Sequence, residues 1–169
     1  MDEAEFWRLI DLARDNSASC ISLAKRLTKE LQRRDPAEIV RFQEIFSGCM
    51  DRAYRADLWD IYSIINGGCG DDGFEYFRCW LISRGKDVFE RVLADPTVLP
   101  DLLASTIPWQ CEELLYCAMK AFKAATGKEA PHEIFVTPPV DLVGDLTPED
   151  ELEDRYPAVW KRWQELEEE

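Results

Sequence analysis

The sequence has little histidine, no closely spaced cysteine pair and no long apolar run. With His132 as its one histidine, a three-histidine zinc site is impossible, and this residue lies in a proline-rich stretch where we expect an exposed loop. None of the six cysteines forms a C-x-x-C pair, so the usual zinc-ribbon and thioredoxin signatures are absent. No apolar run approaches the roughly 20 residues that cross a bilayer, and the first residues are acidic where a secretory signal would be basic. We therefore expect a soluble, cytoplasmic protein with no membrane contact.

Basic residues are also scarce. The chain has 20 Lys and Arg against 34 Asp and Glu, a formal net charge of −14. This balance opposes direct nucleic-acid binding, because binding to phosphates depends on Lys and Arg. Half of the net charge lies between residues 145 and 169, with ten acids and three bases. We expect a solvated acidic helix there, and the charge favours attraction to a basic protein.

The cysteines are expected to stay reduced. In the absence of a secretory signal, a disulfide framework is not predicted. Five of them lie beside apolar residues in helical patterns and are interpreted as small core residues: Cys20, Cys49, Cys79, Cys111 and Cys117.

The composition predicts an all-α protein with one helical core. Hydrophobic residues make up 46% of the chain, and Pro36 is the only proline before Pro96. We predict a helical core domain over 1–130, a Pro-rich extended connection over 131–147, and an acidic helical segment over 148–169 that packs on this domain or frays from it.

Capping residues and apolar spacing indicate where the helices lie. Asp2 is expected to cap the first helix and Ser17 to open the second. Asp35 is placed at the N-cap of the third, with Pro36 in its first turn and Glu38 at the capping-box position. A buried central helix over 58–65, either separate or a bent continuation of the third, ends at Gly67. The remaining expected elements are helices over 73–83, 86–93 and 109–125, an extended segment over 133–137, and a helical stretch from Thr147 that is broken at Tyr156-Pro157.

A glycine-rich loop is the most informative stretch of the chain. Four of the eight glycines fall between residues 67 and 73. The candidate binding or structural-motif residues are Asn66, Gly67, Gly68, Cys69, Asp71, Asp72 and Arg78. A phosphate cradle would need Lys and Ser or Thr after the glycines, whereas here two aspartates would repel an anion. The acids do not follow calcium-loop spacing, so Asp71 and Asp72 remain only weak candidates for an irregular metal site.

Catalytic roles for this loop are not favoured. A helix N-terminus would activate the Cys69 thiol, but the adjacent aspartates oppose this and no base is near in the sequence. The same position favours ionised Asp71 and Asp72, whereas a general acid needs a raised pKa. The favoured interpretation is structural: one of the aspartates caps a helix that begins at Gly73, and the glycines let two buried helices turn tightly.

Arg78 shares a helix face with apolar residues. A cation on this face needs an acidic partner, because burying it unpaired costs several kcal/mol. The partners considered are Asp71, Asp72, Glu112 and Glu113. On this hypothesis Arg78→Ala lowers the melting temperature by several degrees. The alternative is that Arg78 anchors an anionic ligand.

Residues 66–74, Asn-Gly-Gly-Cys-Gly-Asp-Asp-Gly-Phe, followed by Tyr76-Phe77-Arg78 and Trp80-Leu81-Ile82, resemble the core motif of the bacterial domain-of-unknown-function 4240 family. Similar pieces are Phe6-Trp7, Ala53-Tyr54, Leu58-Trp59 and 113–116. The family has Ser where this chain has Gly70, a change expected to loosen the loop or remove a cap. The resemblance covers most of the chain up to the late loop and implies a mostly helical bacterial domain. It implies no activity, because the family has no established one, and so it only directs attention to Asn66, Asp71, Asp72 and Arg78.

These observations favour a non-catalytic protein-interaction module. No catalytic residue, metal or cofactor is assigned, and the expected partner is a protein, with a basic one favoured by charge. The first alternative is an enzyme that binds a metal or small ligand in the segment from Asn66 to Arg78. The second is a nucleic-acid mimic or regulator, since an acidic surface can imitate a polyanion.

Overall fold

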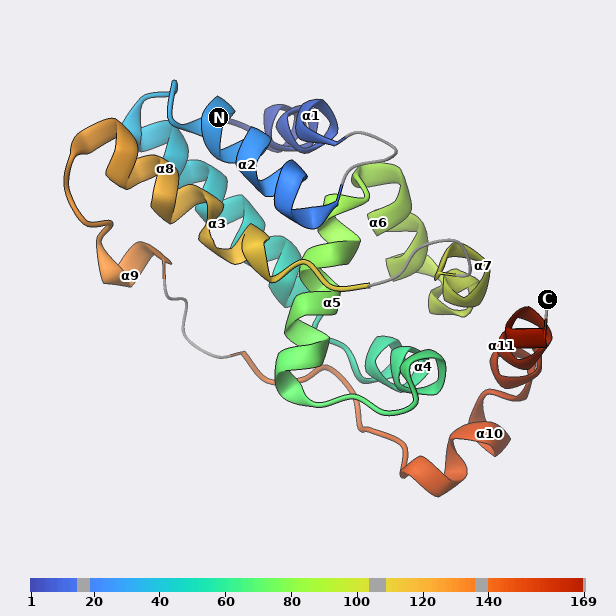
Figure 1. The fold of residues 1–169 in the computed structure, drawn as a ribbon. Helices are drawn as coiled ribbons and strands as arrows, with labels where there is room; N and C mark the ends of the chain where they lie inside the picture. Colours follow the sequence, from blue (N-terminus) through green and yellow to red (C-terminus); the bar gives the residue numbers. More distant parts are fainter. Residues whose placement is uncertain (15–18, 104–108, 136–139, 169) are drawn as a thin grey trace.

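A computed structural model describes residues 1–14, 19–103, 109–135 and 140–168 (Figure 1). Within these ranges the chain forms eleven α-helices and three short 3-10 helices. They contain no strand, and the one isolated bridge joins Arg55 and Val143. The all-α prediction is therefore confirmed. None of the described helices is both long and apolar enough to cross a bilayer.

The starts of the first three helices can be compared with the predicted capping residues. Helix α1 (Glu3–Ala13) begins after Asp2, whose carboxylate accepts a hydrogen bond from the Glu5 amide. Helix α2 (Cys20–Leu31) is capped by Ser19; the predicted opening residue, Ser17, lies outside the described residues. Helix α3 (Pro36–Arg52) begins with Pro36 as predicted.

The predicted capping box at the start of α3 is not formed. The Asp35 side chain makes no capping bond, and the Glu38 carboxylate lies 3.6 Å from Arg34. Arg34 also binds Glu5 of α1, so the turn before α3 is held by ion pairs to its neighbours. Hydrogen bonds from Arg8 and Arg34 lower the pKa of Glu5 to about 2.

Helix α4 (Ala56–Asn66) is separate from α3, which decides between the two predicted arrangements. Gly67 ends it with φ 68°, a left-handed conformation that glycine adopts without steric cost. Helix α5 (Asp71–Ser83) begins two residues before the predicted start, and α6 (Lys86–Ala94) ends before Asp95-Pro96 as expected.

The later elements depart more from the predicted pattern. They are η1 (Pro96–Val98), α7 (Leu99–Leu103), η2 (Glu112–Tyr116), α8 (Cys117–Thr126), α9 (His132–Phe135), η3 (Glu149–Glu151), α10 (Leu152–Arg155) and α11 (Pro157–Glu168). The predicted helix start at Trp109 was wrong. The Cys111 amide donates a hydrogen bond to the Tyr76 carbonyl of α5, and this bond holds the stretch out of a helix.

The prediction of an extended segment over 133–137 was also wrong for residues 133–135, because they belong to the short helix α9. Its first turn follows Pro131, whose carbonyl accepts from the Ile134 amide, and proline suits the start of a helix. Residues 136 and 137 lie outside the described ranges. His132 is exposed, as predicted, but it is the first residue of α9 rather than part of a loop.

Helix α5 runs through the centre of the molecule, and α2, α3 and α8 pack together to one side of it (Figure 1). Its side chains Phe74, Phe77 and Leu81 are fully buried. Helix α4 buries eight of its eleven residues, because α7, α10 and α11 pack against it. The predicted buried pair of helices joined by a glycine-rich loop is therefore α4 and α5.

The acidic C-terminal segment packs on this helical body. Asp60 of α4 is 3% exposed, and its carboxylate accepts hydrogen bonds from the Thr147 amide, the Thr147 hydroxyl and the Tyr156 hydroxyl. Val159 of α11 is buried. In Figure 1 the orange-to-red chain passes beneath α5 and α4 and ends beside α7.

Candidate functional site

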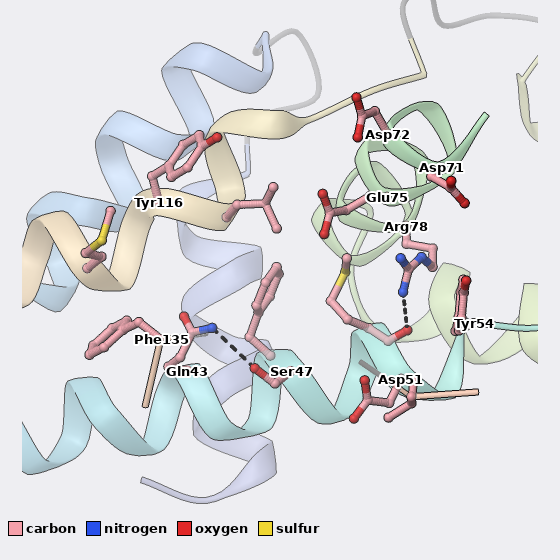
Figure 2. Close-up of a pocket in the computed structure, with 15 residues that line it drawn as sticks. Gln43, Ser47, Asp51, Tyr54, Asp71, Asp72, Glu75, Arg78, Tyr116 and Phe135 are labelled. Atoms are coloured by element: carbon pink, nitrogen blue, oxygen red, sulfur yellow. Dashed lines mark hydrogen bonds between the residues drawn. The ribbon is translucent and has the colours of Figure 1, made fainter. Parts of the chain in front are cut away.

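A groove of about 690 Å³ lies between α3, α5, η2–α8 and α9 (Figure 2). One side of it is apolar. Phe46 and Met50 come from α3, Leu115 and Met119 from η2 and α8, and Phe135 from α9. Met119 is 38% exposed although it is apolar, so this wall presents hydrophobic surface to solvent. On the α3 floor, the Gln43 amide donates a hydrogen bond to the Ser47 hydroxyl.

The opposite side of the groove is acidic. Asp71, Asp72 and Glu75 come from α5, and Asp51 comes from α3 (Figure 2). Figure 2 shows the Glu75 carboxylate directed toward the groove. In the part of the chain that the structure describes, none of these four carboxylates forms an ion pair or a side-chain hydrogen bond. No ion pair within the described ranges therefore balances their negative charge, and Arg78 interacts with Asp51 and Glu75 only through longer-range electrostatics.

The predicted capping role of Asp71 and Asp72 was wrong. The α5 helix starts at Asp71, and Gly70 is its N-cap residue without a side-chain capping bond. Both carboxylates therefore lie in the first helical turn, where the helix dipole stabilises negative charge. This position leaves their oxygens exposed at the groove rather than bonded to backbone amides.

Arg78 lies at the groove without the predicted acidic partner. Its guanidinium donates to the Met50 carbonyl at 2.9 Å. The guanidinium carbon lies 4.6 Å from the centroid of the Tyr54 ring and 5.2 Å from that of Phe74. Nε is buried and finds no partner among the described residues, and burial lowers the Arg78 pKa.

The prediction of an ion pair for Arg78 was therefore wrong. Aromatic faces and a helix-end carbonyl take the place of a carboxylate, because the α5 helix directs Arg78 toward the end of α3. Figure 2 shows Asp71 and Asp72 at the start of α5, away from that contact.

The remaining predicted site residues form the turn between α4 and α5. The Asn66 side-chain amide donates to the Gly68 carbonyl, and the Gly68 amide donates to the Ser63 carbonyl, which closes the end of α4. Gly67 and Gly68 have φ of 68° and 112°, values that favour glycine. Burial and nearby Asp71 raise the pKa of the Cys69 thiol to about 11, which favours the unreactive protonated form.

The structure thus divides the predicted residues into two groups. Asp71, Asp72 and Arg78 line the groove, whereas the stretch from Asn66 to Cys69 does not. The other lining residues were not predicted as site residues, and among them are Asp51, Tyr54 and Glu75. Glu75 could have been found from its spacing, since it lies three residues before Arg78 and so on the same helix face. Asp51 and Tyr54 carry no such signal, because Asp51 comes from α3 and Tyr54 from the connection between α3 and α4.

Asp71 and Asp72 do not belong to a cluster with the donor count of a metal site. Among the described residues, one group of three ligating side chains has all its donor atoms within 4.8 Å of one another: Cys20, Cys111 and Glu113. It lies outside the groove lining.

Cys20 and Cys111 form a disulfide, so the expectation that every thiol stays reduced was wrong. A backbone hydrogen bond from Cys111 to Tyr76 holds the segment before η2 against α5, and α2 packs against η2. The Cα atoms of Cys20 and Cys111 are 5.3 Å apart. Such a distance suits a disulfide. Cys20 is half-buried rather than a core residue, whereas Cys49, Cys79 and Cys117 are buried free cysteines as predicted.

Two substitutions of Arg78 are expected to distinguish how much its aliphatic stem and how much its charge contribute to the free energy of unfolding. Arg78→Met retains a stem over the Tyr54 and Phe74 rings and removes an unpaired buried cation, so its free energy of unfolding should lie within about 1 kcal/mol of wild type. Arg78→Ala loses the stem as well and should cost about 2–3 kcal/mol. Urea denaturation followed by tryptophan fluorescence measures both. Equal losses in the two variants would show that the polar contacts of the guanidinium, rather than its stem, stabilise this junction.

Comparison with known proteins gives one match. The model of a family described as "Protein of unknown function (DUF4240)" matches residues 1–124. This range contains α1 to α7, η2 and most of α8, and hence the acidic side of the groove. No curated protein and no solved structure matches the chain.

Proposed function

We propose a function for this chain, which belongs to the DUF4240 family: it is a non-catalytic protein-interaction module whose groove binds a basic amphipathic segment of another protein. One observation carries the proposal: four carboxylates that form no ion pair among the described residues share a groove with a partly exposed apolar wall. The proposal assigns no chemistry to the groove.

Charge supports a basic partner. Among the described residues that line the groove, Asp51, Asp71, Asp72 and Glu75 are accompanied by one cation, Arg78, whose exposure is restricted by the rings that it contacts. Elsewhere on the surface many acids are matched, for example Glu90 by Arg52 and Glu5 by Arg34. The groove acids are available to lysine or arginine side chains of a partner. The net charge of −14 adds long-range attraction, which speeds association with a basic protein.

The apolar wall supports an amphipathic partner rather than a purely basic one. Met119 and Tyr116 are 38% and 36% exposed, and Leu115 and Phe135 are half-buried beside them. Apolar side chains of a bound segment would cover this wall while its basic residues contact α5. Aromatic and methionine side chains are enriched at protein interfaces because they bury much apolar area.

Synthetic peptides test this proposal directly. The probe is a fluorescent helical peptide with lysines on one face and leucines on the other, and fluorescence anisotropy measures its affinity. The groove variant is Asp51→Asn/Asp72→Asn/Glu75→Gln. The control variant, Glu153→Gln/Asp154→Asn/Glu168→Gln, removes the same charge from exposed positions of the C-terminal segment.

We expect the groove variant to bind at least about tenfold more weakly than wild type, and the control variant to bind within about twofold. A peptide with the same lysines but serine in place of leucine should also bind more weakly, because the apolar wall is then left uncovered. The proposal is contradicted if the groove and control variants lose affinity equally, since the peptide would then respond only to net charge.

A further inference from the structure

We propose that Cys20, Cys111 and Glu113 form a Zn²⁺ site when the two cysteines are reduced, and that the Cys20–Cys111 disulfide is the metal-free, oxidised form of the same site. The three side chains come from two parts of the chain. Cys20 is the first residue of α2, whereas Cys111 and Glu113 lie before and within η2. Their sulfur and carboxylate oxygen atoms all lie within 4.8 Å of one another.

The backbone spacing suits both forms. Tetrahedral zinc with Zn–S bonds of about 2.3 Å places two thiolate sulfurs roughly 3.8 Å apart. The Cα atoms of Cys20 and Cys111 are 5.3 Å apart, so the sulfurs reach this separation by side-chain rotation alone. Cys20 is half-buried, which gives its sulfur room to turn and gives an ion access from solvent. Cys111 is buried and provides the fixed side of the site.

The position of Glu113 fits the third ligand of the site. Its Oε2 lies 3.0 Å from the Cys20 sulfur. In the disulfide that sulfur has no proton, so the Glu113 carboxylate oxygen receives no hydrogen bond from it. Within the described ranges the Glu113 carboxylate has no ion pair and no other side-chain partner. A divalent cation between the carboxylate and two thiolates would satisfy all three groups.

The donor set favours zinc over harder cations. Thiolates select soft or borderline ions, and three protein ligands leave a fourth tetrahedral position for water. The nearby Cys117 is not a fourth ligand, because its thiol is directed to the carbonyls of Ala24 and Glu113.

Oxidation and metal binding exclude each other at this site. With oxidised glutathione as the oxidant, the two thiolates give two electrons to its S–S bond and join as the Cys20–Cys111 disulfide. The oxidant takes two protons from solvent and becomes two thiols, and Zn²⁺ leaves because both sulfur ligands are lost.

Metal titration of the full chain tests the proposal. The protein is reduced with a phosphine, freed of metal and titrated with Co²⁺, whose visible and thiolate charge-transfer bands report tetrahedral sulfur coordination; Zn²⁺ then displaces the Co²⁺. We expect one ion per chain for the reduced wild type and none for the oxidised form. Cys20→Ser and Cys111→Ser should abolish the thiolate bands, whereas Cys69→Ser should leave them unchanged.

Two glutamine variants at neighbouring glutamates provide a second test in case a cysteine variant does not fold. Glu113→Gln should weaken Zn²⁺ binding at least about tenfold, while the neighbouring Glu112→Gln should bind as wild type. Absence of Co²⁺ thiolate bands in the reduced wild type would overturn the proposal. So would equal binding by the two glutamine variants, or retention of the ion by the oxidised protein. None of these results bears on peptide binding in the groove, which uses other residues.

Discussion

Phe77→Ala is expected to lower the free energy of unfolding by about 3–5 kcal/mol. Phe77 lies on the central helix α5 and is fully buried. Its ring stacks on Tyr62 of α4 at 4.0 Å between centroids, and Trp80 lies 5.9 Å away on its own helix. Truncation removes these contacts and leaves a cavity that close-packed neighbours cannot fill. The substitution therefore weakens the contact between the two helices that the glycine-rich loop joins.

Urea denaturation and thermal melting measure this loss. For a chain of this length, the expected cost corresponds to a fall of roughly 6–20 °C in melting temperature. Phe135→Ala is the matched control, because it removes the same ring from a half-buried position on α9 and should cost less than half as much. If the two substitutions had equal costs, the central role of α5 in the core would be wrong.

Asp60→Ala is expected to cost about 2–4 kcal/mol and to loosen the C-terminal segment. The carboxylate is 3% exposed and receives hydrogen bonds from the amide and hydroxyl of Thr147 and from the Tyr156 hydroxyl. Its removal leaves several donors unpaired in a half-buried place, and each unsatisfied group carries a desolvation penalty. The bonds connect α4 to a segment more than 80 positions later, so the loss should appear first in that segment.

Limited proteolysis and hydrogen exchange detect this local effect. Cleavage within 140–156 should become faster in Asp60→Ala, and the Thr147 amide should lose protection from exchange. Asp57→Ala is the control from the same helix, since the ion pair of Asp57 with Arg55 lies nearer the surface and contributes less. An unchanged cleavage rate in Asp60→Ala would mean that other contacts, such as those of Val159, hold the segment in place.

Much of the helical framework could be predicted because its signals are local. Asp2 and Pro36 begin helices, and Gly67 ends one, where the sequence places them. Each acts through its own backbone preference or through a bond within one turn. Some of the errors occurred where a distant residue competes with that local preference. The stretch from Trp109 is the clearest case, because a hydrogen bond to Tyr76 holds Cys111 outside the helix that its pattern favours.

The candidate site was predictable only in part. The glycine-rich loop and the acids after it drew attention to α5, and Asp71, Asp72 and Arg78 do lie in one groove. Their roles differ from those predicted, since the aspartates face the groove instead of capping the helix and Arg78 contacts rings and a carbonyl. The other side of the groove comes from α3, η2–α8 and α9, and no spacing along the chain indicates that these elements meet.

The sequence by itself determined the helical class, the strong negative charge and most helix ends, because periodicity, composition and capping depend on residues within a few positions of each other. Tertiary structure alone decided which groups face one another across the molecule. It placed Cys20 against Cys111, Asp60 against Thr147, and the acids of α5 opposite Met119. Such contacts depend on how helices pack, and packing depends on the shape of the whole core rather than on any single stretch of chain.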